Sequence, residues 1–394
     1  MLKDGTHGTH RDFVDGPLLL SAKNIKNGKI NISNNERHIS ISDFESIHKS
    51  FRLKKGDILL TIVGSIGQTA IYNGDTHITF QRSVAYLRTK DIDSEFLRFL
   101  IMAPHFQKKL KINQVVSAQP GIYLGDIKNI SIKYSKNSNE QLLIKNILNL
   151  IDISITLQQR QLDLYKKLKK GLLQKLFPKD GEKVPEVRFA DFHEDWKQFK
   201  LNELRDFNDK YSFTGGPFGS DLKSSDYTSD GIRIIQLQNI GDGFFLNNYK
   251  IYTSKEKAQS LSSNYIYPGE IIIAKMASPL ARATIIPKLT DIFLMSSDGI
   301  RLKIDSKKYD NYFVLTAINN SSFRKKALAN SSGTTRKRIG LAVLGNLILN
   351  IPKFQEQVKV GGTFKRIDRQ ITLQYEKLNK LNFFKKYLLQ KLFI

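Results

Sequence analysis

The sequence predicts an α+β fold in which two tandem α/β modules are separated by two long helices that pair with each other as a coiled coil. Three observations support this fold: a helical block occurs twice, a weaker similarity relates the segments before each copy, and those segments alternate short strand-like runs with glycine-rich turns. The expected boundaries are 1–138 for the first module, 139–178 for the first helix, 179–194 for a linker, 195–354 for the second module and 355–394 for the second helix.

The repeat is clearest in the helical block. Glu140 to Phe177 reads EQLLIKNILNLIDISITLQQRQLDLYKKLKKGLLQKLF, and Glu356 to Phe393 reads EQVKVGGTFKRIDRQITLQYEKLNKLNFFKKYLLQKLF, without a gap. The dipeptide Ile-Asp (151–152 and 367–368), the run ITLQ (155–158 and 371–374) and the closing LLQKLF (172–177 and 388–393) are identical at a shift of 216 residues. Agreement at this density indicates two related halves.

Within each copy, residues spaced alternately by three and four form an a/d seam, which is typical of a coiled coil. The seam residues that we expect to pair are Ile151, Ile155, Gln158, Leu162, Tyr165, Leu172, Ile367, Ile371, Gln374, Leu378, Leu381 and Leu388. Polar residues break the seam at matching places, Gln158 with Gln374 and Lys169 with Lys385. Polar seam residues specify register and partner, so the pattern favours pairing of the two helices over two amphipathic helices buried separately. Pro178 ends the first helix and begins the linker.

Each module reads as a compact α+β domain. Strand-like runs include DILLTIVG, ITFQRSVAYLR, IIQLQNI, EIIIAK and FLMSSDGIRLKI, and short helices are expected at 94–107 and at 309–327. The second module opens with a segment, 187–214, for which the first has no counterpart. The first module is therefore expected to be shortened at its start.

Charge and composition restrict the class of protein. Lys and Arg number 62 against 37 Asp and Glu, a net charge of +25, which favours polyanionic partners such as nucleic acid. No cysteine is present, which excludes disulfides, thiolate catalysis and cysteine-ligated zinc. The N-terminal residues do not resemble a signal peptide, and no apolar run approaches the ~20 residues that cross a bilayer. A cytoplasmic protein without a membrane partner is expected.

Several loops combine small residues, amides, hydroxyls and basic side chains. Backbone amides and lysines hold phosphates, while Arg, Asn and Gln read base edges in the major groove, so these loops are predicted to contact DNA. In the first module the candidates are Thr6, His7, Thr9, His10, Arg11, Lys23, Asn24, Gln68, Gln81, Arg82, Gln119 and Tyr123. In the second they are Ser220, Lys223, Gln236, Gln238, Asn239, Lys275, Ser278, Arg282, Thr334, Thr335, Arg336, Lys337 and Arg338. For any one of these residues an ordinary role in a polar turn is the alternative.

Motifs for catalysis are missing from the sequence. No Pro-Pro occurs, so the Asn/Asp-Pro-Pro-aromatic motif of a methyltransferase is absent, and no P-loop occurs. Asp195-Trp196-Lys197 after Asp180 is a poor match to a nuclease motif, and His7 with His10 lacks a third zinc ligand. We expect no catalytic residue, no metal site and no cofactor bound by this chain.

Two divergent modules, each followed by a similar helix ending in KKxLLQKLF, resemble the specificity subunit of type I restriction-modification systems over essentially the full length. The most specific elements are the block from Glu140 to Pro178, its copy ending at Phe393 and the turn SAQPGIYLGDIKNI before the first block. The segment DWKQFKLNEL leading to GGPFGSDLK also looks like the start of a target recognition domain of that family.

The resemblance implies more than the residues do. It implies two target recognition domains, each reading one half of a bipartite site in double-stranded DNA, and two spacer helices that pair antiparallel and set the gap between the half-sites. It also implies two modification (methyltransferase) subunits docked on the helices and restriction (motor-nuclease) subunits, with S-adenosylmethionine, ATP and Mg on those partners. The alternative from another class is a coiled-coil scaffold joining two protein- or RNA-binding modules.

Overall fold

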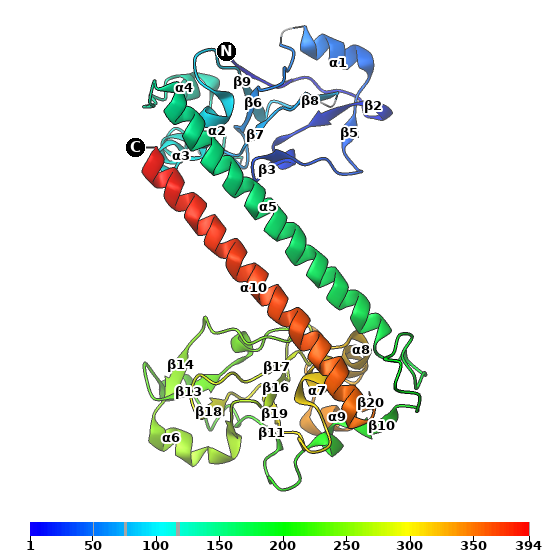
Figure 1. Ribbon diagram of the computed structural model, residues 1–394. Coiled ribbons are helices and arrows are strands. Elements are labelled where there is room, and N and C mark those ends of the chain that lie inside the picture. Colours follow the sequence, from blue (N-terminus) through cyan, green and yellow to red (C-terminus); the bar gives the residue numbers. More distant parts are fainter. Residues whose placement is uncertain (50, 75–76, 116–118, 394) are drawn as a thin grey trace. The chain divides into compact units, whose positions relative to one another are not determined.

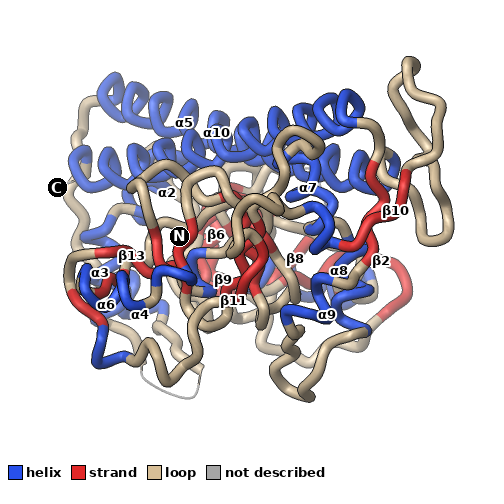
Figure 2. The backbone as a smooth tube through the Cα atoms, turned by 90° about the horizontal axis from the view of Figure 1, so that it is seen from below, coloured by secondary structure: helices blue, strands red, loops and turns tan. Residues whose placement is uncertain are grey.

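The computed structural model describes residues 1–49, 51–74, 77–115 and 119–393. The chain forms two compact units, of which unit 1 comprises Met1–Gln161 with Gln374–Ile394 and unit 2 comprises Leu162–Leu373. Two long helices, α5 (Ser138–Lys175) and α10 (Phe354–Leu392), run without a break (Figures 1 and 2). Each unit therefore contains one module and a part of each long helix.

The module of unit 1 contains a four-stranded sheet in the order β1-β9-β6-β7, a three-stranded sheet β5-β2-β8 and a short β3-β4 pair. Its strands are β1 (Leu2–Asp4), β2 (Phe13–Leu20), β3 (Ile25–Lys26), β4 (Lys29–Ile30), β5 (Arg37–His38), β6 (Ile58–Thr61), β7 (Thr69–Ile71), β8 (Ile78–Phe80) and β9 (Val84–Leu87). Its helices are α1 (Ile41–His48), α2 (Ser94–Met102), α3 (Pro104–Ile112) and α4 (Leu124–Lys128).

The module of unit 2 contains sheets in the orders β11-β19-β16-β17, β12-β14-β13-β18-β15 and β10-β20. Its strands are β10 (Lys197–Lys200), β11 (Phe213–Gly215), β12 (Tyr227–Thr228), β13 (Ile232–Ile235), β14 (Ile251–Thr253), β15 (Tyr265–Ile266), β16 (Ile271–Ala274), β17 (Ala283–Ile285), β18 (Phe293–Met295), β19 (Gly299–Leu302) and β20 (Ile348–Ile351). Its helices are α6 (Lys255–Ser260), α7 (Asn311–Ile318), α8 (Ser321–Ala329) and α9 (Leu341–Gly345).

The two modules share a topology. In each, four strands follow the same order, β1-β9-β6-β7 in unit 1 and β11-β19-β16-β17 in unit 2, with antiparallel pairing throughout. In each, a second sheet contains one parallel pair, β2 with β8 and β13 with β18. This correspondence confirms the weak internal similarity on which the tandem arrangement was predicted.

The stretches expected as short helices at 94–107 and 309–327 are helical, but each is divided into two helices. In unit 1, Ala103 is extended and Pro104 opens α3, as the steric restriction on the residue before proline requires. In unit 2, the side chain of Asn320 accepts a hydrogen bond from Ser322 N and so begins α8 separately from α7.

Trp196, in the opening segment of the second module, lies in the core of unit 2. It is 2% exposed, and its ring contacts those of Phe177, at the end of α5, and Phe313 of α7. The following strand β10 pairs antiparallel with β20. In the described part of unit 1, no strand pairs with residues 131–134, which occupy the position of β20.

The long helices contribute directly to both cores. In unit 1, Ile144 and Leu148 of α5 share a buried cluster with Leu389 of α10, so the start of α5 lies beside the end of α10. In unit 2, Phe364 of α10, which matches Leu148 in the repeat, is fully buried with Phe177. The two helices therefore run antiparallel within each unit, as predicted. Among the described helices, none combines the length and apolar character needed to cross a lipid bilayer.

The two lysines of the seam have defined partners. Lys169 of α5 pairs with Asp368 of α10 at 2.6 Å in unit 2, and Lys385 of α10 pairs with Asp152 of α5 at 2.5 Å in unit 1. These are the same interaction in the two halves of the repeat. Tyr312 donates a hydrogen bond to Asp368 at 2.8 Å, and burial together with this carboxylate raises the pKa of Tyr312, which keeps it a donor. Each lysine at the seam thus helps to fix the register of the pair.

Reversing one charge of this pair should destabilise unit 2. Asp368→Lys places two ammonium groups together, and we expect the free energy of unfolding to fall by about 1.5 to 3 kcal/mol. The double variant with Lys169→Asp should regain much of this loss. Glu376→Lys, at an exposed position of α10, should change stability by less than about 0.5 kcal/mol. Denaturant unfolding measures all three, and a double variant no more stable than Asp368→Lys would contradict the pairing.

Candidate nucleic-acid interface

A groove of about 1100 Å³ opens in unit 2 between the last turns of α5, helices α7 and α8, and three loops of the module. Lys166, Lys169 and Lys170 of α5 lie on one side, and the loops around Gly243, Ser278 and Arg336 lie on the others. Met276, Leu280, Leu315 and Leu328 are among its apolar lining residues. The groove therefore joins the spacer helix to the loops that were predicted to contact DNA.

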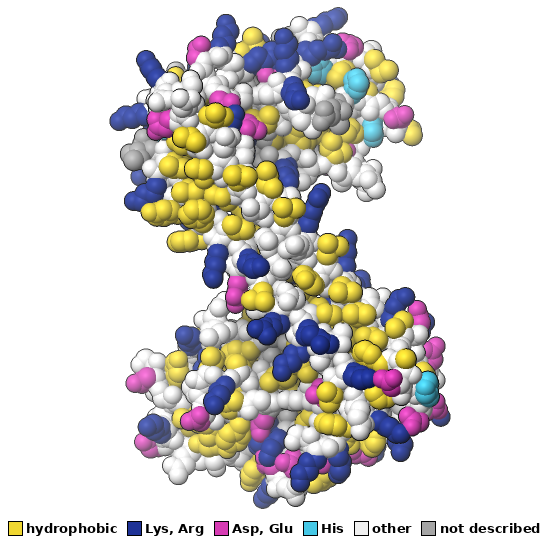
Figure 3. All heavy atoms as spheres, in the orientation of Figure 1, with side chains coloured by type: hydrophobic (Ala, Val, Ile, Leu, Met, Phe, Trp, Pro, Cys, Tyr) yellow, Lys and Arg dark blue, Asp and Glu magenta, His cyan; other side chains and the backbone are white. Residues whose placement is uncertain are grey.

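The lining of the groove is strongly cationic. It includes seven Lys and Arg side chains against two carboxylates, Asp242 and Asp368. Both carboxylates are already paired, with Arg324 at 2.6 Å and Lys169 at 2.6 Å respectively. Within the described chain, no hydrogen bond or ion pair holds the side chains of Lys170, Lys325, Arg336 and Lys337. On the face of unit 2 seen in Figure 3, Lys and Arg side chains gather beside the long helices. An unneutralised cationic groove attracts polyanions.

Two loops that were predicted separately come together at this groove. The loop of residues 331–338 closes on itself through paired backbone hydrogen bonds between Ser332 and Arg338. It is joined to the loop after β16 by a bridge between Met276 and Arg338 and by a hydrogen bond from Ile339 N to Lys275 O at 3.0 Å. Thr334, Thr335, Arg336 and Lys337 are all exposed on this loop. The fold thus presents one continuous basic edge.

The arginines around the groove differ in their freedom. Arg338 pairs with Asp298 at 2.5 Å, and Arg282 donates to the carbonyl of Leu237 at 2.9 Å. Arg324 donates to Asp242 and to the side chain of Asn319. These three guanidiniums hold the groove walls together. Arg336 is the guanidinium left available to a ligand among the described groove residues.

Unit 1 contains a similar arrangement. Gly121 bridges to both Val63 and Val115, as Arg338 does to Met276 and Ser332. Gln119 therefore occupies the position of Arg336, next to the loop that carries the exposed Gln68, and the exposed ring of Tyr123 follows. Residues 117 and 118 of the predicted loop lie outside the described residues. The two modules present different side chains from equivalent positions.

The N-terminal loop lies beside a second predicted stretch. Thr6 bridges to Gln81, and Arg82 N donates to Thr6 O at 2.9 Å. His7 contacts Asp4 at 2.7 Å, whereas His10 contacts Thr6 at 2.9 Å and Asp43 at 3.2 Å. Each histidine therefore has a different carboxylate partner, and the two do not converge on one site. Thr9, Arg11 and Arg82 are exposed around them.

Two predicted DNA contacts, Asn24 and Asn239, are wrong. Both are buried, and each amide bonds to backbone groups of its own turn. Asn24 accepts from Ser21 N and donates to Asn31 O, and Asn239 accepts from Gln236 N and donates to Leu246 O. Each closes the turn that follows, so no polar atom of the side chain is left for DNA.

The remaining candidates lie at the surface or at its edge. Lys23 pairs with Glu36 at 3.0 Å, and Gln236 donates to the hydroxyl of Tyr227 at 3.2 Å. Ser220, Lys223, Gln238 and Ser278 are exposed, and Lys275 is half-buried. The site prediction missed Lys166, Lys170 and Lys325 in the groove. The sequence shows these lysines in two basic runs, at 166–170 and 324–326, but such runs usually mark a solvated helix face and do not by themselves indicate a DNA contact.

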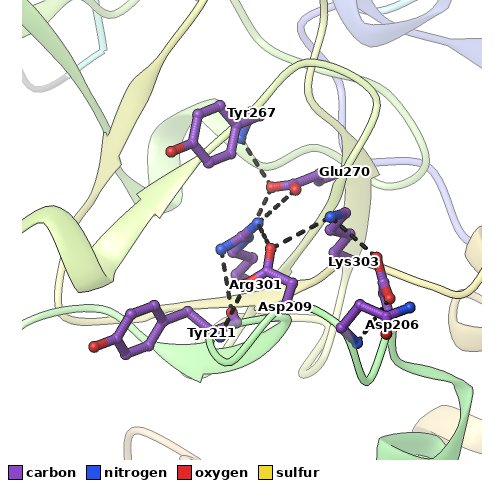
Figure 4. Close-up of polar contacts among 8 residues, drawn as sticks. Asp206, Asp209, Tyr211, Tyr267, Glu270, Arg301 and Lys303 are labelled. Atoms are coloured by element: carbon purple, nitrogen blue, oxygen red, sulfur yellow. Dashed lines mark hydrogen bonds and ion pairs between the residues drawn. The ribbon is translucent and has the colours of Figure 1, made fainter.

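A buried ion network holds the strand that leads into the groove loop (Figure 4). Arg301 of β19 is 3% exposed and binds Glu270, just before β16, at 2.6 and 2.8 Å and Asp209 at 2.7 Å. Burial raises the pKa of Asp209, but the hydrogen bond from Tyr211 N and the charges of Arg301 and Lys303 outweigh it and lower that pKa. Unit 1 has a simpler version, Asp57 with Arg88 at 2.6 Å. The network ties β16 to β19.

Comparisons with known proteins agree with this architecture. The model of the family described as the type I restriction modification DNA specificity domain matches residues 13–165 and 193–382. The putative type I restriction enzyme MjaX specificity subunit of Methanocaldococcus jannaschii is 25% identical over 355 residues, 87% of this chain and 78% of that protein. The MjaVIII specificity subunit of the same organism is 24% identical over 260 residues, 64% of this chain; the match spans 59% of that protein's length.

Solved structures show the same fold. The type I restriction-modification S subunit from M. genitalium matches with a TM-score of 0.64 and 17% identity, covering all of this chain and 93% of that one. A chain from a structural study of complex assembly and conformational transition in the type I system matches with a TM-score of 0.52 and 16% identity, covering 94% and 90%. Because the family match includes both modules and most of both long helices, this chain belongs to the family of type I restriction-modification DNA specificity subunits.

Proposed function

We propose that this chain gives a type I restriction-modification complex its DNA sequence specificity, with each module reading one half of a bipartite site. The observation that carries the proposal is the cationic groove of unit 2, where Arg336 has no ion-pair partner among the described residues and lies with Lys170, Lys325 and Lys337. Lysines supply affinity through phosphates, whereas a guanidinium can bind guanine through two hydrogen bonds in the major groove. The groove thus offers both kinds of contact side by side.

We infer that the modification subunits dock on the long helices. In unit 1, Ile147, Leu150, Ile153 and Leu157 follow one face of α5 and are between 46% and 64% exposed. A row of large apolar side chains in water is unfavourable and favours a protein partner. The loops are polar and basic, so this apolar face suits a protein partner, whereas the loops suit DNA.

Catalysis belongs to the partners in this proposal. The chain would act in the cytoplasm as a non-catalytic subunit, and S-adenosylmethionine, ATP and Mg would bind to the modification and restriction subunits. The proposal takes two modification subunits, one for each copy of the helical block.

The first test is to express the chain with its cognate modification subunit and to map methylated adenines in the host DNA by single-molecule sequencing. A bipartite motif with a fixed gap is the expected result. A motif with one defined half would restrict reading to one module. A stable complex without any motif, together with salt-sensitive binding that ignores sequence, would favour the scaffold alternative.

Lengthening the spacer should lengthen the gap. One heptad inserted between Gln161 and Leu162 and another between Leu373 and Gln374 adds roughly 10.5 Å to the paired helices and keeps the seam in phase. This is about three base pairs at 3.4 Å each. Three base pairs also turn the second half-site by about 100°, so methylation at the new optimum should be slower. An unchanged gap in the methylated motif would refute the spacer role.

A further inference from the structure

One face of unit 2 is covered by the segment that joins its long helix to its module. Glu356, in the first turn of α10, is 1% exposed because Arg188 binds both its carboxylate oxygens at 2.8 Å and Trp196 donates to it at 3.3 Å. Lys359, one turn further, pairs with Asp191 at 2.6 Å. The same segment donates from Val187 N to Lys175 O at the end of α5. Residues 186–200 thus form a cover that is held by charge, by an indole ring and by the β10-β20 pair.

The equivalent face of unit 1 is open among the described residues. Glu140 takes the place of Glu356 in the repeat, but it is exposed and no ion pair holds it. Leu392 is 37% exposed where its counterpart Leu176 is 6% exposed, and Tyr134 is 36% exposed where Ile351 is 3% exposed. Beneath these residues Ile132, Ile144 and Phe393 belong to one apolar cluster. The open face therefore presents the groups that the cover binds in unit 2: a carboxylate, an apolar floor and, among the described residues, a stretch to which no strand is paired.

We propose that this open face, formed by residues 130–134, Glu140 and the last turn of α10, is a docking site for an extended polypeptide segment with the chemistry of residues 186–200. Such a segment carries an arginine for Glu140, a tryptophan eight residues later, and then a short strand. The strand adds to residues 131–134 as β10 adds to β20, which is recognition by an added β-strand.

Charge complementarity supports this occupant over a general apolar partner. A carboxylate that accepts two parallel hydrogen bonds from one guanidinium forms a strong and directional ion pair, which Lys cannot reproduce. An acidic or purely apolar segment would leave Glu140 without a cationic partner, whereas an arginine at the matching position pairs with it. Residues 186–200 are the model for the occupant because they bind the equivalent groups in unit 2.

The test uses the full chain and a labelled synthetic peptide of residues 183–204, with binding followed by fluorescence anisotropy. We expect saturable binding that weakens about tenfold or more with Glu140→Gln in the chain, or with Arg188→Gln in the peptide. Pairing Glu140→Arg in the chain with Arg188→Glu in the peptide should restore binding. Hydrogen exchange should show new protection at residues 130–134 when the peptide is bound.

The matched control is Glu376→Gln, which removes a carboxylate from an exposed position of the same unit and should leave peptide binding unchanged. Three results would overturn the proposal: no saturable binding, equal binding to the Glu140→Gln chain, or protection that rises at residues 348–351 instead, which would show displacement of the chain's own segment in unit 2. The outcome is independent of DNA reading, because none of the altered residues lies in the groove.

Discussion

Replacing Glu270 with Ala is expected to lower the free energy of unfolding of unit 2 by about 3 to 5 kcal/mol. Arg301 is almost fully buried, and Glu270 neutralises it through two hydrogen bonds while also accepting one from Tyr267 N at 2.9 Å. Removing the carboxylate leaves a buried guanidinium with Asp209 as its remaining anionic partner in the network (Figure 4). The penalty is the desolvation of a charge without its main counter-charge.

The chain contains its own reporter for this change. Trp196 is the single tryptophan in the sequence and lies in the core of unit 2, so denaturant unfolding followed by its fluorescence reports on that unit. Glu256→Ala, at an exposed position of α6, should shift the curve by less than about 0.5 kcal/mol. Replacing both Arg301 and Glu270 with Met should be milder than Glu270→Ala alone, because no buried charge is left unpaired. A loss below about 1 kcal/mol for Glu270→Ala would contradict this account.

The same network makes stability depend on acid. The folded state lowers the pKa of Asp209 below its value in an unfolded chain, about 3.9, so the unfolded state takes up a proton first as the pH falls. The stabilisation from Asp209 is therefore fully present above about pH 4 and is lost as the pH falls through the folded pKa. The stability difference between the natural chain and Asp209→Asn should shrink in that range.

The repeat made the long helices predictable. Two copies with the same seam and the same polar interruptions indicate a pair, and the expected bounds of 139–178 and 355–394 lie close to Ser138–Lys175 and Phe354–Leu392. The separation of α7 from α8 was not predictable in the same way. No proline marks it, and the break rests on the hydrogen bond of one asparagine, Asn320, whose rotamer the sequence does not specify.

Comparing matched positions of the two modules also separates structural residues from candidate DNA contacts, which residue type alone does not. Asn24 and Asn239 are identical at matched positions of two modules that would read different sequences, which favours a shared structural role, and both are buried turn residues. Arg336 and Gln119 differ at matched positions of equivalent loops. Differences on a common scaffold are therefore a better guide to specificity than the amides and hydroxyls that the two halves share.

Arg336→Ala should relax specificity at one half-site, with a cost of about 1 to 3 kcal/mol in binding the preferred base, or roughly 5-fold to 150-fold in affinity. Arg336 is exposed on the loop of residues 331–338, and no hydrogen bond or ion pair holds its side chain within the described residues. A true base contact loses discrimination at one position of the motif and leaves the other half unchanged. The methylation map of the complex formed with the modification subunit reads this out position by position.

Arg338→Ala is the matched comparison, because it removes the same group two residues away. Arg338 pairs with Asp298, so its loss should disturb the loop. Binding to all DNA sequences should then weaken equally, and specificity at a single base position should not relax. Lys337→Ala should also weaken binding to all sequences equally, and it should reduce the slope of log affinity against log salt concentration by about one. If Arg336→Ala behaves like Lys337→Ala, then Arg336 contacts a phosphate. Base reading in unit 2 would then have to come from another exposed side chain of the same groove edge, and Thr335 would be the next to replace.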